Sequence, residues 1–270
     1  MNAAPPDHDT LRPERMAPLW RGRLFAAERY HYHERIGSTN QEAMQLARAG
    51  APEGTLVVAE GQSGGRGRLG RVWESPSGEN LYLSMVLRPD LPVAHAPRLT
   101  LVAGLATVEA VLAAGVAEAR LKWPNDVLVN GRKLAGILTE MATEGERIRQ
   151  VTVGVGVNVN GRSADFSPEV AARAVTMADI LHRTCERAEL LAALLVAMER
   201  WYARLLTEGF APIRIAWKEW ALLEGQRVRV ESATGSREGW LEDLDEEGFL
   251  LVRGAEGEIW RVLAGDVVLV

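Results

Sequence analysis

A glycine- and arginine-rich segment, residues 60–73, carries the residue types best suited to bind an anion. It reads EGQSGGRGRLGRVW and places Arg66, Arg68 and Arg71 between glycines. A guanidinium group binds a carboxylate or phosphate through two parallel hydrogen bonds, and glycine lets the backbone approach a ligand closely. The segment therefore predicts a loop that orders around an anion and excludes water as it closes. A solvated, flexible basic loop is the alternative.

The same segment contains the spacing Gly65-x-Gly67-x-x-Gly70, which is also the fingerprint of a dinucleotide-binding turn. That turn must lead at once into a helix whose N-terminus faces the pyrophosphate. Here the chain continues through SPSG, residues 75–78, into a predicted strand. We therefore reject the dinucleotide interpretation.

A second polar group follows in the sequence KWPND, residues 122–126, which ends a predicted strand. Asn125 can both donate to and accept from a nucleobase edge, and Asp126 can accept a hydrogen bond or help to hold Mg²⁺. An Asx-type turn after the proline is the structural alternative. Lys133 begins the apolar strand KLAGIL, where its ammonium group needs an anionic partner nearby, and this favours a ligand. The alternative is that the aliphatic part of the side chain extends far enough to place the ammonium group at the surface.

A third pattern, GVGVNVN, places Gly154, Gly156, Asn158 and Asn160 on one face of a strand. Small residues on that face leave space for a flat group, unless the strand is simply bulged. His31 and His33 also share a strand face, but the sequence shows no third ligand at a spacing suited to zinc, so we predict no metal site.

The composition is that of a globular protein with an internal core. The chain has 270 residues, 31 Lys and Arg against 36 Asp and Glu, a net charge of −5 and a single cysteine. A negative balance argues against a general nucleic-acid binder, and one cysteine forms no internal disulfide. The most apolar stretch, residues 100–119, contains Glu109 and much Ala and Gly, which favours a buried helix over a membrane span. No secretory signal layout is present, so we expect a cytoplasmic protein with no membrane partner.

Hydrophobic periodicity and turn residues predict the elements that must position these side chains. Strands are expected at 30–35, 55–60, 80–87, 120–123, 127–129, 133–140 and 148–157, and helices at 38–49, 96–115, 176–182, 186–206 and 211–222. Ser38 and Thr39 fit the capping-box spacing for the first helix, and Asn130–Gly131 is a two-residue hairpin signal. Hairpins beside grouped helices indicate an α+β fold with a mixed, largely antiparallel sheet.

The predicted organisation has three parts. Residues 1–24, rich in Pro, Asp and Arg, are expected to form a loose tail, and residues 25–222 a catalytic domain. Residues 223–270 contain short strands with Gly-containing turns, typical of a small β-barrel. About 48 residues are too few to be very stable alone, so we expect this barrel to dock on the first domain.

These motifs together resemble the biotin protein ligase family. The resemblance rests on Ser38-Thr39-Asn40, the pattern from Glu60 to Trp73, Lys122–Asp126, Lys133–Leu138 and Gly154-x-Gly156-x-Asn158, in that order, and it covers roughly residues 30–160. The segment after residue 222 is similar to that family's C-terminal SH3-like domain. The resemblance implies a fold related to class II aminoacyl-tRNA synthetases, and a two-step reaction in which ATP and biotin form biotinyl-5′-adenylate before a carrier lysine takes the biotin.

The resemblance also implies roles for single residues. Lys133, Arg66 and Arg68 would offset the repulsion between biotin's carboxylate and the α-phosphate. Biotin would be bound by Ser38, Thr39, Asn40, Gln62, Gly65, Arg66, Gly67, Arg68, Lys133 and Gly136. ATP or the adenylate would be held by Arg68, Arg71, Trp73, Asn125, Asp126, Lys133 and Asn158, with Mg²⁺ accompanying ATP.

Two other functions stay open on the sequence alone. One is a lipoate or octanoyl transferase with a similar core, and the other is a non-catalytic biotin-sensing protein. Some family members carry an N-terminal helix-turn-helix domain, but only about 25 polar residues precede the ligase region here, so we expect a monofunctional ligase that binds no nucleic acid. The expected partner is the biotin carboxyl-carrier domain of a biotin-dependent carboxylase, and a homodimer is left open.

Overall fold

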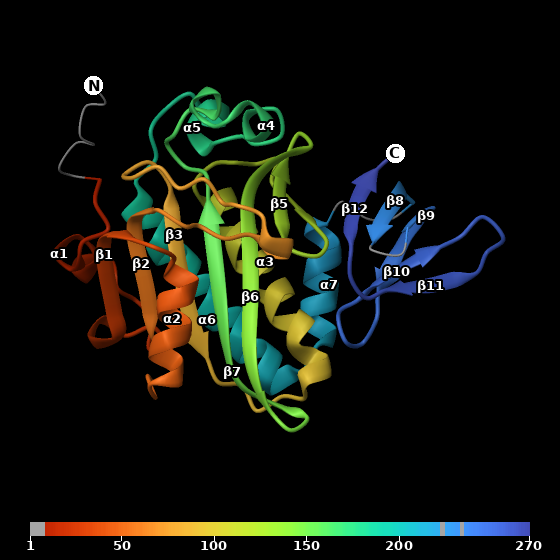
Figure 1. The fold of residues 1–270 in the computed structure, drawn as a ribbon, viewed down its shortest axis with the longest axis horizontal. Helices are drawn as coiled ribbons and strands as arrows, with labels where there is room; N and C mark the ends of the chain where they lie inside the picture. Colours follow the sequence, from red (N-terminus) through yellow and green to blue (C-terminus); the bar gives the residue numbers. More distant parts are fainter. Residues whose placement is uncertain (1–8, 222–224, 233–234) are drawn as a thin grey trace.

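A seven-stranded mixed sheet forms the centre of the protein, as a computed structural model describing residues 9–221, 225–232 and 235–270 shows (Figure 1). Its strand order is β1-β2-β3-β7-β6-β5-β4, with β1 parallel to β2 and every other pair antiparallel. The strands are β1 (Tyr30–Ile36), β2 (Leu56–Gln62), β3 (Leu81–Leu87), β4 (Arg120–Lys122), β5 (Asp126–Val129), β6 (Arg132–Glu144) and β7 (Arg147–Val157). The predicted fold class is confirmed.

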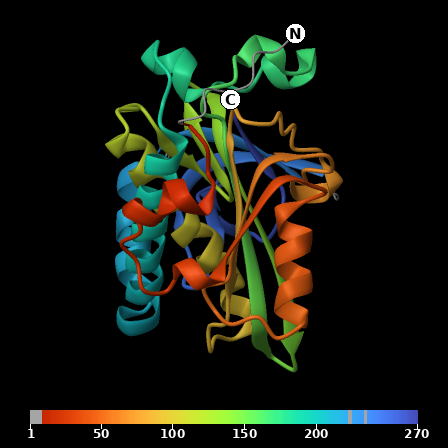
Figure 2. The ribbon, with the colours of Figure 1, turned by 90° about the vertical axis from the view of Figure 1, so that its left-hand side faces the viewer.

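Helices cover both faces of this sheet. The α-helices are α1 (Pro13–Met16), α2 (Thr39–Arg48), α3 (Ala96–Ala113), α4 (Pro168–Ala171), α5 (Met177–Leu181), α6 (Arg187–Glu208) and α7 (Ala211–Trp220). The 3-10 turns are η1 (Ala17–Leu19), η2 (Ala27–Arg29), η3 (Arg68–Gly70), η4 (Val93–His95) and η5 (Ser163–Asp165). Helix α2 packs on one face, and α3 and α6 pack together on the other, so the sheet is sandwiched between them (Figure 2).

Helix α3 is the apolar element that the sequence marked as buried. Among the described residues, Val93–Ala113 is long and apolar enough to cross a membrane, and it is mostly buried inside the protein. It packs against α6, α7 and the sheet strands β4 to β7. This is the environment of a core helix, as predicted.

The β5–β6 hairpin forms where the sequence placed it. Asn130 and Gly131 adopt φ values of 50° and 75°, the left-handed conformation that a tight two-residue turn needs. The capping-box prediction at the start of α2 is wrong, because the described structure gives the Ser38 side chain no capping hydrogen bond. Gln62 of β2 takes that place, since its Oε1 accepts from the Thr39 backbone N–H at 2.9 Å.

The C-terminal segment forms a second, five-stranded antiparallel sheet, called here the C-terminal sheet (residues 225–232 and 235–270). Its strands are β8 (Arg227–Ser232), β9 (Gly235–Leu244), β10 (Leu250–Arg253), β11 (Ile259–Val262) and β12 (Asp266–Leu269), in the order β11-β10-β9-β8-β12. It docks on the first domain as expected: Trp123 Nε1 donates to the Gly248 carbonyl, and Arg214 of α7 pairs with Asp243. The predicted boundary at residues 222 and 223 lies outside the described residues.

The prediction of a loose tail is wrong for residues 9–24; residues 1–8 lie outside the described part. Leu11 and Met16 are buried in the main core, and Asp9 is buried as well. The Tyr30 hydroxyl donates to the Leu11 carbonyl at 2.6 Å, which ties this segment to β1. The segment is therefore part of the folded domain.

Candidate active site

A polar cluster gathers where the N-terminus of α2 meets the end of β2. Ser38, Thr39 and Asn40 are all buried. Gln62 Oε1 accepts from the Thr39 N–H and lies 3.2 Å from the Thr39 hydroxyl, while its Nε2 donates to Ser75 Oγ at 3.0 Å. The structure therefore brings the serine–threonine–asparagine motif and Gln62 into one polar cluster, although Asn40 and Gln62 are 22 positions apart in the chain.

Asn40 occupies the space above Gly154. Its Oδ1 lies 2.7 Å from the hydroxyl of Ser84, a fully buried residue of β3. A Cβ on Gly154 would come within 2.3 Å of the same oxygen, so only glycine leaves room for this amide. Ser84 was missed by the sequence reasoning; a lone serine in the apolar strand LYLSMVL was the available signal.

Replacing Gly154 with alanine is expected to weaken binding of biotin, the ligand that the sequence resemblance implies for Asn40, by about 10-fold or more. The reason is that one misplaced buried hydrogen bond costs about 1–3 kcal/mol. The Asn40 amide has little freedom to move away, since hydrogen bonds hold both of its ends. Calorimetric titration measures the effect. Gly161→Ala is the matched control, because its Cβ would meet only an ordinary contact at 3.5 Å; equal affinities for the two variants would contradict this steric account.

The glycine–arginine loop, residues 63–73, follows β2 and folds back on itself before the chain reaches β3. Trp73 N donates to the Gly65 carbonyl at 2.9 Å, and Gly67 N donates to the Arg71 carbonyl at 2.7 Å. A Cβ on Gly65 would lie 2.3 Å from the Trp73 carbonyl oxygen, which explains the glycine there. The next long element is a strand, not the helix that a dinucleotide turn requires, so rejecting that interpretation is confirmed.

The indole of Trp73 lies over two glycines of neighbouring strands. A Cβ on Gly156 would come within 2.6 Å of the ring, and one on Gly136 within 3.0 Å. The flat group on this strand face is therefore Trp73 itself. Its ring centroid lies 5.4 Å from Lys133 Nζ, within range of a cation–π contact.

Lys133 has the anionic partner that its position demanded. Its Nζ lies 2.6 Å from Asp126 Oδ1, across the β5–β6 pair. About a third of the Lys133 side chain is exposed, so a ligand can reach it while it remains paired. The two motifs KWPND and KLAGIL thus meet at one ion pair.

The three loop arginines each contact a different acceptor of the protein. Arg66 lies 3.5 Å from Glu140, Arg68 Nη1 donates to Asn125 Oδ1 at 3.1 Å, and Arg71 pairs with Asp266 of β12. Burial lowers the pKa of Arg68, with Asp266 and Asp126 acting in the opposite direction. With Lys133, four cations stand against the three carboxylates Glu140, Asp266 and Asp126, and this positive balance favours an anionic ligand. Glu140 and Asp266 were not predicted, and Asp266 had no sequence signal, being 195 residues from Arg71.

Asn125 and Asn158 bind the backbone around the site. Asn125 Nδ2 donates to the Ile137 carbonyl at 2.8 Å, leaving its Oδ1 to Arg68. The buried Asn158 donates to the carbonyls of Lys133 and Val175, both at 3.3 Å. Asn158 thereby fixes the backbone from which Lys133 projects, and its direct contact with a nucleotide or Mg²⁺ stays a prediction.

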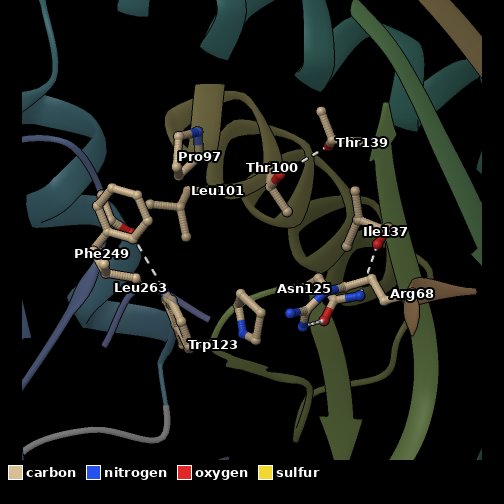
Figure 3. Close-up of a pocket in the computed structure, with 12 residues that line it drawn as sticks. Arg68, Pro97, Thr100, Leu101, Trp123, Asn125, Ile137, Thr139, Phe249 and Leu263 are labelled. Carbon is tan, nitrogen blue, oxygen red and sulfur yellow. Dashed lines mark hydrogen bonds between the residues drawn. The ribbon is translucent and has the colours of Figure 1, made fainter. Parts of the chain in front are cut away.

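A cavity of about 160 Å³ lies between α3, the KWPND segment and the C-terminal sheet (Figure 3). Arg68 stands at one side of it, while Phe249 and Leu263 contribute an apolar wall from the C-terminal sheet. Within the described ranges, no three His, Cys, Asp or Glu side chains gather in a way that would hold a metal ion.

Two protein-family models match segments of this chain. Residues 32–158 match the "Biotin/lipoate A/B protein ligase family", and residues 225–270 match the "Biotin protein ligase C terminal domain". The chain is 40% identical to the biotin–[acetyl-CoA-carboxylase] ligase of Paracoccus denitrificans, over 83% of this chain and 93% of that protein. It is also 40% identical to the bifunctional ligase/repressor BirA of Bacillus subtilis, over 88% of this chain and 73% of that protein.

Solved structures of biotin protein ligases have a fold similar to that of this chain. The biotin protein ligase of Aquifex aeolicus in complex with biotin and ATP superposes with a TM-score of 0.76 at 30% identity, over 89% of this chain and 97% of that one. The ligase of Leishmania major in complex with biotinyl-5-AMP gives a TM-score of 0.57 at 26% identity, over 87% and 98%.

Proposed function

Because the chain belongs to the biotin protein ligase family, we propose that its polar pocket and cationic loop carry out the two steps of biotin attachment. The protein is an ATP-dependent biotin–protein ligase. In the first step a biotin carboxylate oxygen attacks the α-phosphorus of ATP, and the Pα–O bond to the β-phosphate breaks, giving biotinyl-5′-AMP and pyrophosphate. In the second, a neutral lysine amine of the carrier attacks the acyl carbon, AMP leaves, and the amine's proton is lost to solvent.

The observation that supports this assignment most strongly is the position of Lys133 beside Trp73 of the glycine–arginine loop, together with the polar cluster of Thr39, Asn40 and Gln62. Two anions must approach each other in the first step, so fixed positive charge lowers the barrier. We assign this work to Lys133, Arg66 and Arg68. The Asn40 and Gln62 amides then hold the ureido ring, and Ser38, Thr39, Gly65, Gly67 and Gly136 form the pocket around the rest of biotin.

The nucleotide side is assigned to Trp73, Arg71, Asn125, Asp126 and Asn158. Trp73 offers a ring on which adenine can stack, and Arg71 offers a guanidinium to the phosphates. Mg²⁺ is expected to arrive with ATP, because the triphosphate carries the oxygen ligands that this cation prefers. Loop closure over the adenylate would protect a mixed anhydride that water hydrolyses readily.

The wider context is proposed on the same basis. The partner is the biotin carboxyl-carrier domain of a carboxylase such as acetyl-CoA carboxylase, and the cytoplasm is the expected location. We extend the predicted catalytic domain, residues 25–222, to include residues 9–24, which are part of the same fold. We retain residues 223–270 as the C-terminal unit and propose a ligase without a nucleic-acid partner. A measurement of the molecular mass in solution tests whether two copies of the chain form a homodimer.

The test is transfer of biotin to a carrier domain. The protein, biotin, MgATP and an unmodified carrier domain are incubated, and the carrier is examined by mass spectrometry for the added biotinyl group at one lysine. No added mass on an authentic carrier would refute the proposal. Calorimetry with biotin and lipoate separates this function from that of a lipoate ligase, and a gel shift on operator DNA tests for a nucleic-acid partner.

Asp266→Asn is expected to lower the KM for ATP by about two- to fivefold, in keeping with the small energy of exposed ion pairs. Asp266 already pairs with the Arg71 guanidinium, so the triphosphate must displace Asp266 to bind Arg71. The hydrogen bond from Arg71 lowers the pKa of Asp266, so the carboxylate is ionised throughout the neutral range. The change in KM should therefore be the same from about pH 6 to 8. Asp90→Asn, which breaks the exposed Asp90–Arg147 pair, is the matched control. A raised KM in the Asp266 variant would show that Asp266 assists Arg71 instead.

A further inference from the structure

Glu140, on β6, contacts two of the assigned pocket residues from different parts of the chain. Its Oε2 accepts from Asn40 Nδ2 at 2.8 Å, and its Oε1 lies 3.5 Å from Arg66 Nη1. Its side chain is about one quarter exposed. A carboxylate this close to a pocket for an anionic substrate is unfavourable unless it has positive charge beside it, and Arg66 supplies that charge.

The contact with Asn40 fixes the orientation of that amide. Asn40 Nδ2 also lies 3.3 Å from the Leu138 carbonyl, so both of its neighbours on that side can only accept hydrogen bonds. The amide nitrogen must therefore point toward β6. Its Oδ1 points to Ser84, which donates to it, and keeps a second lone pair for a ligand N–H.

The contact with Arg66 fixes one side of the loop arginine. Arg66 is about 42% exposed and sits in a loop whose two sides are joined by short pairings such as the bridge between Arg66 and Val72. A guanidinium has five N–H donors in a planar fork. Pairing with Glu140 at one edge leaves the remaining donors for a substrate carboxylate.

We propose that Glu140 is a positioning residue that couples recognition of the ureido ring at Asn40 to placement of the glycine–arginine loop through Arg66. This inference rests on the proposed function of the pocket. A ligand whose ring N–H engages Asn40 Oδ1 strengthens the orientation that Glu140 already imposes, and the same carboxylate holds Arg66 over the pocket. Ring recognition and loop order therefore depend on one side chain.

Two substitutions separate the two contacts. Glu140→Gln keeps an acceptor for Asn40 but removes the charge that holds Arg66, whereas Glu140→Ala removes both. Glu144→Gln, an exposed position on the same strand, is the matched control. The measurements are the Kd for biotin alone, the Kd for ATP alone, the melting temperature, and the rate at which trypsin cleaves the loop at its arginines.

The glutamine variant is expected to bind biotin about three- to tenfold more weakly and the alanine variant about 10- to 100-fold more weakly, the range for one and then two lost polar contacts. Loop cleavage by trypsin should rise about threefold or more in both, since the exposed Arg66–Glu140 pair is a modest restraint. Biotin should slow cleavage in the wild type more than in either variant. The Kd for ATP should change less than the Kd for biotin, because Arg68 and Arg71 keep their own partners, Asn125 and Asp266. The melting temperature should stay close to that of the Glu144→Gln control.

Wild-type biotin affinity and loop cleavage in both variants would overturn the inference. A fall in melting temperature with equal losses for biotin and ATP would also overturn it, because that pattern indicates a purely structural carboxylate. If the wild type itself fails to bind biotin, the proposed function fails. Trypsin cleavage without ligand then still tests whether Glu140 holds Arg66.

Discussion

Lys133→Ala is expected to reduce the rate of biotinyl-5′-adenylate formation by about 10²- to 10³-fold, the size typical for loss of one preorganised charge-stabilising group. The Lys133 ammonium lies within 2.6 Å of Asp126 and beside the Trp73 ring, at the point where biotin's carboxylate and the α-phosphate are proposed to meet. Its removal leaves Asp126 without its cation, so like charges would then confront the incoming anions. The measurement is single-turnover adenylate formation with radiolabelled ATP.

The fold should survive this substitution. Lys133 is about one third exposed, and the backbone that holds it is fixed by Asn158 and by the β5–β6 pairing. Arg149→Ala, which removes an exposed cation from the neighbouring strand β7, should leave the rate within about twofold, as surface substitutions usually do. A wild-type rate in Lys133→Ala would remove Lys133 from the mechanism.

Arg187→Met is expected to lower the free energy of unfolding by about 3–5 kcal/mol, the cost of breaking a buried ion pair from one side. The Arg187 side chain is fully buried and pairs with Asp9 at 3.0 Å and with Glu60 at 2.7 Å. Methionine fills a similar volume but leaves both buried carboxylates without their cation. Denaturant unfolding followed by circular dichroism measures the loss.

Arg204→Met provides the comparison for this prediction. Arg204 lies on the same helix, α6, and pairs with Glu208 in an exposed i,i+4 contact, which should contribute less than about 0.5 kcal/mol. Similar stability losses in the two variants would contradict the role given to burial. Arg187 holds Glu60, which lies just before the glycine–arginine loop. Arg187→Met should therefore also weaken biotin binding under conditions in which the protein is still folded.

Local sequence patterns predicted the central sheet well. The Asn130–Gly131 pair identified the β5–β6 hairpin, because few other residues tolerate two successive left-handed conformations. The order of the motifs identified the family, and the structure places Asn40 at the start of α2, Gln62 at the end of β2 and Lys133 near the start of β6. These features depend on residues that are close in sequence or that belong to a dense motif.

Features that depend on distant partners were not predictable. Polar composition made residues 9–24 look like a tail, yet Asp9 is held by Arg187, 178 residues away. Likewise, Asp266 meets Arg71 only because the C-terminal sheet docks beside the loop, and Glu140 meets Asn40 only through the packing of α2 on the sheet. No local pattern distinguishes these carboxylates from solvated ones.

The formation of biotinyl-5′-AMP without a carrier tests the central claim most directly. The protein is incubated with biotin and MgATP, separated from free nucleotide by gel filtration, and its bound small molecules are identified by mass spectrometry. The account predicts that biotinyl-5′-AMP remains on the protein and that omitting either biotin or ATP abolishes it. A protein that retains no adenylate with biotin, but forms one with lipoate, would contradict the account.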